Sequence, residues 1–142
     1  MNILVINGPN LNMLGTRETS IYGSLTLNDI QKYTETELTQ SKVSLTWWQS
    51  NSEAEIIKKI HEAVNSDLDA LIINPAAYSH TSVAILDALK ILSIPIVEVH
   101  LTNVYNREAF RHEMLTAKAS SIIMSGLGKD AYLFAVNALL KR

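Results

Sequence analysis

Apolar and polar residues alternate along this chain in blocks that predict strands and helices in turn. Five runs rich in β-branched and apolar residues predict strands, at residues 2–6, 43–48, 70–74, 95–100 and 121–125. Several of these runs are apolar on both faces, which is typical of strands buried in a parallel sheet.

Between the predicted strands, apolar residues recur at helical spacing. Thr26 and Ser52 each begin a pattern of the capping-box type, followed by a stripe of apolar positions. A third helix is predicted over 82–92, and a last helix carries Ala131 and the apolar residues that follow it. The segment 103–118 has no clear period and is expected to hold a loop and a helix.

This alternation predicts a single α/β domain over residues 1–142 with a five-stranded parallel sheet. The length favours a flavodoxin-like, doubly wound sandwich over a barrel, which typically needs about 250 residues. Ligands in such sheets bind at the carboxyl ends of the strands, near the point where the strand order reverses. That point lies here between the first and third strands, so we expect the chemistry just after residues 6, 74, 100 and 125.

Composition excludes several classes of function. The chain is 47% hydrophobic and 18% charged, as in a globular protein, and its net charge of −2 gives no electrostatic footprint for nucleic acid or an anionic membrane. It has no cysteine, so it has neither a disulfide nor a thiolate metal site. No run approaches the ~20 apolar residues of a membrane span, and no leader precedes the first strand. We therefore expect a cytoplasmic protein.

The loop after the first strand is unusually long. Residues 7–23 fit neither helix nor strand, and loops beyond about 12–15 residues are usually functional or disordered. Three of the four arginines, Arg17, Arg107 and Arg111, lie in this loop or after the fourth strand. Because a guanidinium group can bind a carboxylate or phosphate through two hydrogen bonds, this placement predicts a small anionic ligand.

One pair of titratable residues and one single acid are further candidates for function. Glu98 and His100 lie two residues apart in the fourth strand, so their side chains share one face. A carboxylate in a buried strand is costly unless paired, and a bond to His100 would also orient the imidazole. Asp87 is the only acid in a nearly apolar helical stretch, and it fits a structural or intersubunit ion pair as well as a functional role.

Signatures of competing chemistries are incomplete. The stretch GLGKD at 126–130 is too short for a Walker-type phosphate loop, no nucleophile elbow of a serine hydrolase is present, and no metal-ligand spacing occurs. A phosphoreceiver domain would need an aspartate where Asn74 ends the third strand. A flavin-binding electron carrier would need a Ser/Thr-rich loop after the first strand, where this chain has GPNLNML.

Three blocks, INGPNLNMLGTRETSIYG, INPAAYSHTSVAILDAL and VEVHLTNVYNREAFRHEM, resemble in order and spacing the signature blocks of the type II 3-dehydroquinate dehydratases. The similarity covers essentially the whole chain. It implies a flavodoxin-like fold and a homododecamer built from trimers. The implied reaction dehydrates 3-dehydroquinate to 3-dehydroshikimate through an enolate intermediate in the shikimate pathway of aromatic amino acid biosynthesis, without metal or cofactor.

The resemblance also implies a role for each matching residue. Tyr22 would remove a proton from C2 of the substrate, Arg17 would lower the pKa of that tyrosine, and His100 would protonate the departing C1 hydroxyl. Asn10 and Glu98 would orient His100. The remaining expected contacts with substrate are Asn74, His80, Leu101, Thr102, Arg111 and, from a neighbouring subunit, Asp87.

The chain departs from the family pattern at a few positions, and none of them removes a catalytic group. Thr102 stands where serine is common, Ala76 where glycine is frequent, and Ala109 where proline is frequent. Tyr105 and Asn106 replace a more usual His-Ala pair.

The proposed base must ionise near neutral pH. A tyrosine has an ordinary pKa of ~10, so half ionisation at pH 7 requires a shift of roughly 3 units, or about 4 kcal/mol. One nearby opposite charge shifts a pKa by about 1–3 units, so Arg17 with a second cation such as Arg111 would suffice. The loop of residues 7–23 is therefore expected to be an active-site lid that carries both the base and its cation.

Overall fold

The computed structural model describes residues 1–16 and 18–142, apart from the side chain of Tyr22. Its five-stranded sheet is parallel throughout, in the order β2-β1-β3-β4-β5. The strands are β1 (Asn2–Asn7), β2 (Ser44–Gln49), β3 (Ala70–Asn74), β4 (Ile96–His100) and β5 (Ile122–Ser125). The predicted fold class is confirmed, and each strand agrees with its prediction to within one residue at either end.

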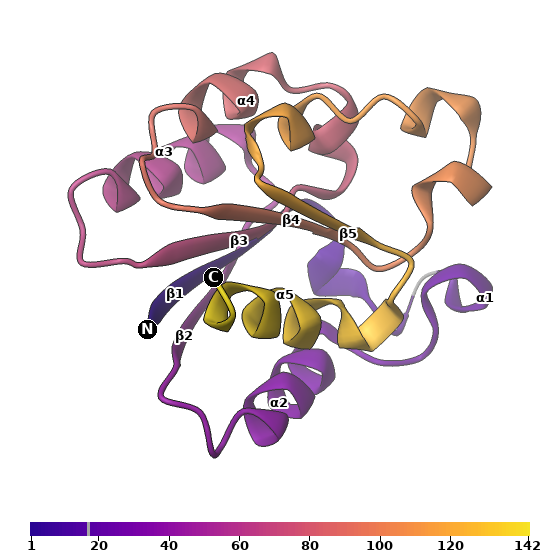
Figure 1. The fold of residues 1–142 in the computed structure, drawn as a ribbon. Helices are drawn as coiled ribbons and strands as arrows, with labels where there is room; N and C mark the ends of the chain where they lie inside the picture. The colour runs from indigo at the N-terminus through magenta and orange to yellow at the C-terminus, as the bar shows by residue number, and fades with distance from the viewer. Residues whose placement is uncertain (17) are drawn as a thin grey trace.

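Helices cover both faces of the sheet (Figure 1). One face carries α3 (Glu53–Ala63) and α4 (Val83–Leu89), and the other carries α2 (Leu27–Glu37) and α5 (Ala131–Leu140). The one-turn helix α1 (Thr19–Tyr22) lies beyond the carboxyl ends of the strands. Within the predicted loop, α1 and the 3-10 helix η1 (Leu11–Met13) are short helices that the sequence pattern did not indicate.

The alternation of side chains along β1 explains the two halves of the core. Ile3 and Val5 pack in the cluster that includes α2 and α5, whereas Leu4 and Ile6 pack with α3 and α4. All four side chains are buried. The sheet is apolar on both faces because both faces are covered, as the continuous apolar runs predicted.

The helix starts follow the predicted caps. Thr26 Oγ1 accepts a hydrogen bond of 3.1 Å from the Asp29 backbone N–H, and the Asp29 carboxylate accepts one of 2.9 Å from the Thr26 N–H. The bond from the Thr26 backbone N–H and, after it, a 2.7 Å bond from the Thr26 hydroxyl to Asp29 Oδ2 hold the pKa of Asp29 below its ordinary value. The Ser52 and Ser82 hydroxyl groups cap α3 and α4 by accepting from the Glu55 and Ile85 N–H groups. The capping box expected at Ser52 is incomplete in the described structure, because the Glu55 carboxylate accepts from the Ser50 hydroxyl instead.

The segment 103–118 differs from its prediction. Short 3-10 turns replace the expected helix: η3 (Val104–Asn106), η4 (Ala109–Arg111) and the start of η5 (Thr116–Ala119). These turns are stabilised by contacts far apart in sequence, such as the 2.7 Å bond from the Leu115 N–H to the Ser79 carbonyl oxygen. Figure 1 shows η3 and η4, in orange, at the same end of the sheet as α1. A second 3-10 pair, η2 (Ala76–His80) and η6 (Gly128–Asp130), follows β3 and β5.

Candidate active site

A cavity of about 140 Å³ opens at the carboxyl ends of β1, β3 and β4. Its walls come from three segments that the strand order brings together: Pro9, Asn10, Leu11 and Leu14; Asn74, Ala76, Ala77 and His80; and His100, Leu101, Thr102, Val104, Arg107 and Arg111. The cavity therefore lies after three of the four strand ends where the chemistry was expected. The residues after 125 do not line it, and Ser125 supports its wall by donating a 3.0 Å hydrogen bond to the Thr102 carbonyl oxygen.

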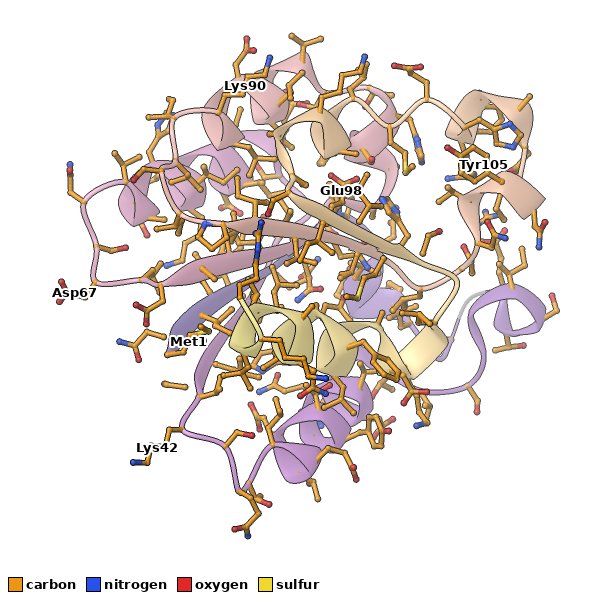
Figure 2. The ribbon with its side chains drawn as sticks, in the orientation of Figure 1. Met1, Lys42, Asp67, Lys90, Glu98 and Tyr105 are labelled. Carbon is orange, nitrogen blue, oxygen red and sulfur yellow. The ribbon has the colours of Figure 1, made fainter. Side chains whose placement is uncertain are left out.

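A buried carboxylate–imidazole pair lies at this cavity. Glu98 and His100 point to the same face of β4, and His100 Nε2 lies 2.8 Å from Glu98 Oε1. The Glu98 side chain is fully buried, and Figure 2 shows it inside the molecule, in contrast to Tyr105 at the periphery. Because the carboxylate accepts from Nε2, the ring presents Nδ1 for exchange of a second proton. The pairing predicted from the spacing of the two residues is confirmed.

Two hydroxyl groups complete the surroundings of the Glu98 carboxylate. Ser79 Oγ donates to Glu98 Oε1 at 2.7 Å, and Thr116 Oγ1 donates to Glu98 Oε2 at 2.8 Å. Both hydroxyl groups are buried and lie 3.1 Å apart. Three hydrogen-bonding partners therefore surround a carboxyl group that has no exposed surface. Because these bonds hold the Glu98 side chain in place, its contact with Nε2 fixes the orientation of the His100 ring.

Cationic side chains also line the cavity. Arg107 and Arg111 both line it from the segment after β4, as expected for these two arginines, and Arg17 lies outside the described residues. Arg111 Nε is paired with Glu108 Oε2 at 2.7 Å, and Arg107 Nε lies 3.6 Å from the same oxygen. A backbone hydrogen bond at Glu108 and then its bond from Arg111 hold the pKa of Glu108 below its ordinary value. An anionic ligand would meet guanidinium groups already oriented by a carboxylate.

His80 contributes a second imidazole to the cavity lining. Burial lowers the pKa of His80 from its ordinary value, only partly opposed by the hydrogen bond at the Glu113 carbonyl oxygen. That oxygen lies 2.9 Å from His80 Nδ1, and because a carbonyl only accepts, Nδ1 carries the proton. The other nitrogen, Nε2, is then an acceptor when the ring is neutral. The ring stacks near that of His100, with 6.3 Å between centroids.

Two residues at the cavity adopt left-handed backbone conformations without being glycine. Asn10 has a φ of 67° and Ala76 has a φ of 52°. The Ala76 N–H donates to Asn74 Oδ1 at 3.2 Å, so the turn after β3 fixes the side-chain amide of Asn74. Backbone strain of this kind often occurs at functional sites, where it holds a side chain in one position.

The described residues offer no assembly for a metal ion. Across 1–16 and 18–142, no group of three or more His, Cys, Asp or Glu side chains could hold one. No helix within the described part of the chain has the length and apolar character needed to cross a membrane. What the cavity provides is a proton-transfer pair beside two guanidinium groups and a neutral imidazole, which suits acid–base chemistry on a small anion.

Comparison with known proteins identifies the family. A family model described as dehydroquinase class II matches residues 1–140. The chain belongs to the class II dehydroquinases. It is 51% identical over 141 residues to the 3-dehydroquinate dehydratase of Enterobacter sp. (strain 638), covering 99% of this chain and 93% of that protein. It is 49% identical over 141 residues to the protein of the same name from Proteus mirabilis (strain HI4320), covering 99% and 95%.

A solved class II dehydroquinase has the same fold. The crystal structure of type II dehydroquinase from Butyrivibrio crossotus DSM 2876 superposes with a TM-score of 0.95 at 42% sequence identity, covering 99% of this chain and 97% of that one. The family resemblance read from the three sequence blocks is therefore confirmed.

In this class II dehydroquinase most of the predicted site residues come together. The cavity is lined by Asn10, Asn74, His80, His100, Leu101, Thr102 and Arg111. Glu98 lies behind His100. Arg17 and the side chain of Tyr22 lie outside the described residues, so their roles remain predictions.

Asn10 lacks the contact with His100 that was expected for it, whereas the position of Asp87 is compatible with the expected role at a neighbouring subunit. Within the described part of the chain, no hydrogen bond joins Asn10 to His100; the Asn10 backbone N–H instead donates to Asn51 Oδ1 at 2.9 Å. Asp87 is exposed on α4 and does not line the cavity of its own chain. A role for Asp87 in catalysis therefore depends on a second subunit.

Sequence reasoning missed three polar residues of this site. Ser79 lies in a block already singled out, next to His80, and its position after β3 was a usable signal. Thr116 lies in the segment without a period, and nothing in the sequence pattern marks it. Tyr132 lies in the first turn of α5, far along the chain from β3, yet its hydroxyl accepts a 3.2 Å hydrogen bond from Asn74 Nδ2.

Proposed function

We propose that this chain dehydrates 3-dehydroquinate to 3-dehydroshikimate in the cytoplasm as a step of the shikimate pathway, using amino-acid side chains alone. The reaction is a hydro-lyase elimination in which a proton leaves C2 and a hydroxyl group leaves C1. The family match over residues 1–140 is the observation that carries this proposal. The cavity supports it independently, because it combines a proton-transfer pair with groups that bind a carboxylate.

The first step is proton abstraction from C2 by the Tyr22 phenolate. The electron pair of the C–H bond moves toward the neighbouring ketone and gives an enolate. Arg17 stabilises the phenolate from the same loop, and the guanidinium groups of Arg107 and Arg111 add positive potential at the cavity. Because arginine stays protonated at every working pH, it stabilises the phenolate without titrating itself.

The second step is loss of the C1 hydroxyl with His100 as the acid. The enolate reforms the ketone, a C1–C2 double bond forms, and the C1–O bond breaks as His100 gives a proton to the leaving oxygen. Glu98 stabilises the imidazolium through the 2.8 Å contact with Nε2, so Nδ1–H is the group that delivers the proton. Asn10 in the left-handed turn after β1 lies in the wall beside this histidine.

Substrate recognition uses the remaining wall. Arg111 binds the carboxylate of the substrate by releasing or sharing its bond with Glu108. The neutral His80 accepts a hydrogen bond from a substrate hydroxyl through Nε2, since Nδ1–H is held by the Glu113 carbonyl oxygen. Thr102 and the backbone of Leu101 supply further polar contacts, and Asn74 holds the substrate or a water molecule near the enolate oxygen.

The assembly that fits this reaction is a homododecamer built from trimers, in which Asp87 reaches the site of a neighbouring subunit. Val83, Asp87 and Ile91 follow one another at four-residue spacing along α4 and its end, so they share one exposed stripe. Val83 and Ile91 are 56% and 55% exposed, which leaves apolar surface on either side of the acid. Sedimentation of a monomer at micromolar concentration would contradict this assembly.

Replacement of Tyr22 by phenylalanine tests the chemistry directly. Loss of a general base typically costs about 10²–10⁴ in rate, so Tyr22→Phe should lose that much kcat while remaining folded and oligomeric. Tyr33→Phe is the matched control, because Tyr33 donates to Asp130 at 2.6 Å outside the cavity and should keep its activity. A Tyr22→Phe variant with near-normal kcat would refute the role of Tyr22.

A further inference from the structure

Tyr132 is a fully buried tyrosine that the proposed chemistry does not use. It lies in the first turn of α5, with its ring 5.1 Å from that of Trp47 and with no exposed surface. Burial raises the pKa of Tyr132 above its ordinary value, opposed by the hydrogen bond from Asn74. The hydroxyl therefore keeps its proton and acts as one donor and one acceptor.

The hydrogen bonds around Tyr132 have a single consistent direction. The chain starts at the Trp48 carbonyl oxygen, which can only accept and which lies 3.4 Å from Asn7 Nδ2. The amide of Asn7 therefore turns its oxygen toward Tyr132, whose hydroxyl donates to Asn7 Oδ1 at 2.5 Å. Because the Tyr132 hydroxyl hydrogen is used in the bond to Asn7, the Tyr132 oxygen acts only as an acceptor toward Asn74 Nδ2, at 3.2 Å.

The same chain of bonds decides which way Asn74 faces. Asn7 and Asn74 are register partners at the carboxyl ends of β1 and β3, where the strand order reverses. Asn74 Nδ2 faces Tyr132, and Asn74 Oδ1 accepts from the Ala76 N–H at 3.2 Å. If the amide rotated by 180°, its oxygen would face the lone pair of Tyr132 and its NH₂ would face the Ala76 N–H, and both bonds would be lost.

The side-chain amide of Asn74 has one N–H that neither of these two bonds uses. Of the two Nδ2 hydrogens of Asn74, one is used by Tyr132, and no residue in the described part of the chain takes the other. The side chain lines the cavity, so this N–H is available to an oxygen placed there. A preorganised donor of this kind stabilises an oxygen on which negative charge develops.

We propose that Tyr132 is a positioning residue that orients the Asn74 amide so that it offers an N–H donor, and not a carbonyl oxygen, to the reacting molecule. The inference rests on the proposed function for the identity of that molecule. Tyr132 touches no substrate itself and acts through Asn74. The acceptor is the oxygen that becomes the enolate, or a water molecule bound to it.

A double-mutant cycle on kcat tests this coupling. Tyr132→Phe removes the hydroxyl and leaves the ring, so the Asn74 amide loses one of its two anchors, and kcat should fall about tenfold, the equivalent of one hydrogen bond, with KM changed less than about threefold. In the Asn74→Ala background the same substitution should change kcat by less than about twofold, because its target is already gone. Tyr33→Phe, which removes a tyrosine hydroxyl from a bond to Asp130 away from the cavity, is the control and should match the wild type.

Two results would overturn the inference. One is a Tyr132→Phe kcat within twofold of the wild type. The other is an equal loss from Tyr132→Phe in the wild-type and Asn74→Ala backgrounds, which indicates a general loss of structure.

Thermal unfolding of the same four proteins gives a readout that needs no turnover. The bond between Tyr132 and Asn74 predicts that the shifts in unfolding midpoint are not additive, and additive shifts would refute the bond. Absence of turnover by the wild type would refute the proposed function, while the midpoints would still decide whether Tyr132 holds Asn74.

Discussion

Thr116→Val removes one donor from the buried Glu98 carboxylate while keeping the shape of the side chain. Thr116 Oγ1 donates to Glu98 Oε2 at 2.8 Å, whereas Ser79 and His100 both bond to Oε1. Among the described residues, Oε2 therefore loses its hydrogen bond in the variant. Because Glu98 is fully buried, no water replaces the missing donor.

The size of the effect follows from the charge and burial of Glu98. A hydrogen bond to a charged group contributes about 1.5–3 kcal/mol, so the free energy of unfolding should fall by that amount. For a domain of this size, roughly 3–4 °C of unfolding midpoint corresponds to 1 kcal/mol, which gives a decrease of about 5–12 °C. A carboxylate with one oxygen unanchored can also rotate and misplace the His100 ring, so kcat should fall roughly 10–100-fold.

The assay is thermal unfolding together with steady-state kinetics at matched protein concentration. Thr36→Val is the control, because Thr36 is exposed and its hydroxyl bonds only within α2, at 2.8 Å to the Lys32 carbonyl oxygen. Its midpoint and kcat should stay close to those of the wild type. Thr116→Ser keeps the donor and should recover most of the kcat lost in Thr116→Val. If Thr116→Val matches Thr36→Val in both measurements, the hydroxyl does not support Glu98 and the reasoning is wrong.

Three further predictions concern the walls of the cavity. Ala76→Gly should raise the free energy of unfolding by about 0.5–1 kcal/mol, because a φ of 52° is strained for alanine, and an unchanged or lower urea midpoint would contradict this. Gly8→Ala should lower the unfolding midpoint, because the new Cβ would lie 2.5 Å from the Pro75 carbonyl oxygen. The free energy of unfolding should fall by about 1–3 kcal/mol. A midpoint equal to that of the wild type would show that the two strand ends can separate freely. Burial lowers the pKa of His80, so the unfolded chain binds more protons than the folded chain as the pH falls below about 6.5, and stability is lost in that direction. The difference in unfolding midpoint, wild type minus His80→Gln, should therefore decrease as the pH is lowered from 8 to 5. A difference that does not change with pH would refute the assignment.

The sheet could be predicted from the sequence because its strands are short apolar runs whose signal is local. The pairing of Glu98 with His100 was also local, since two residues of one strand separated by one position must share a face. The place of the cavity followed from topology, because parallel strands bring their carboxyl ends to one edge. These predictions needed no knowledge of contacts between distant segments.

The parts that could not be predicted depend on such contacts. Thr116 reaches Glu98 only because a turn without periodicity is bonded to the Ser79 backbone through Leu115. Tyr132 is hydrogen-bonded to Asn7, which lies 125 positions away in the sequence. The pattern of its helix is that of an ordinary apolar helix and does not indicate this contact. Asp87 is exposed on α4, so its expected role at a neighbouring subunit stays a prediction.

The most direct test of the central claim is an ultraviolet assay of the purified wild-type protein with 3-dehydroquinate. Dehydration creates a double bond conjugated to the ketone, so the absorbance of the enone reports the reaction continuously. We predict a rise in absorbance that is proportional to enzyme concentration and unchanged by a chelator. A folded, oligomeric sample that gives no rise would contradict the assignment of this cavity to 3-dehydroquinate.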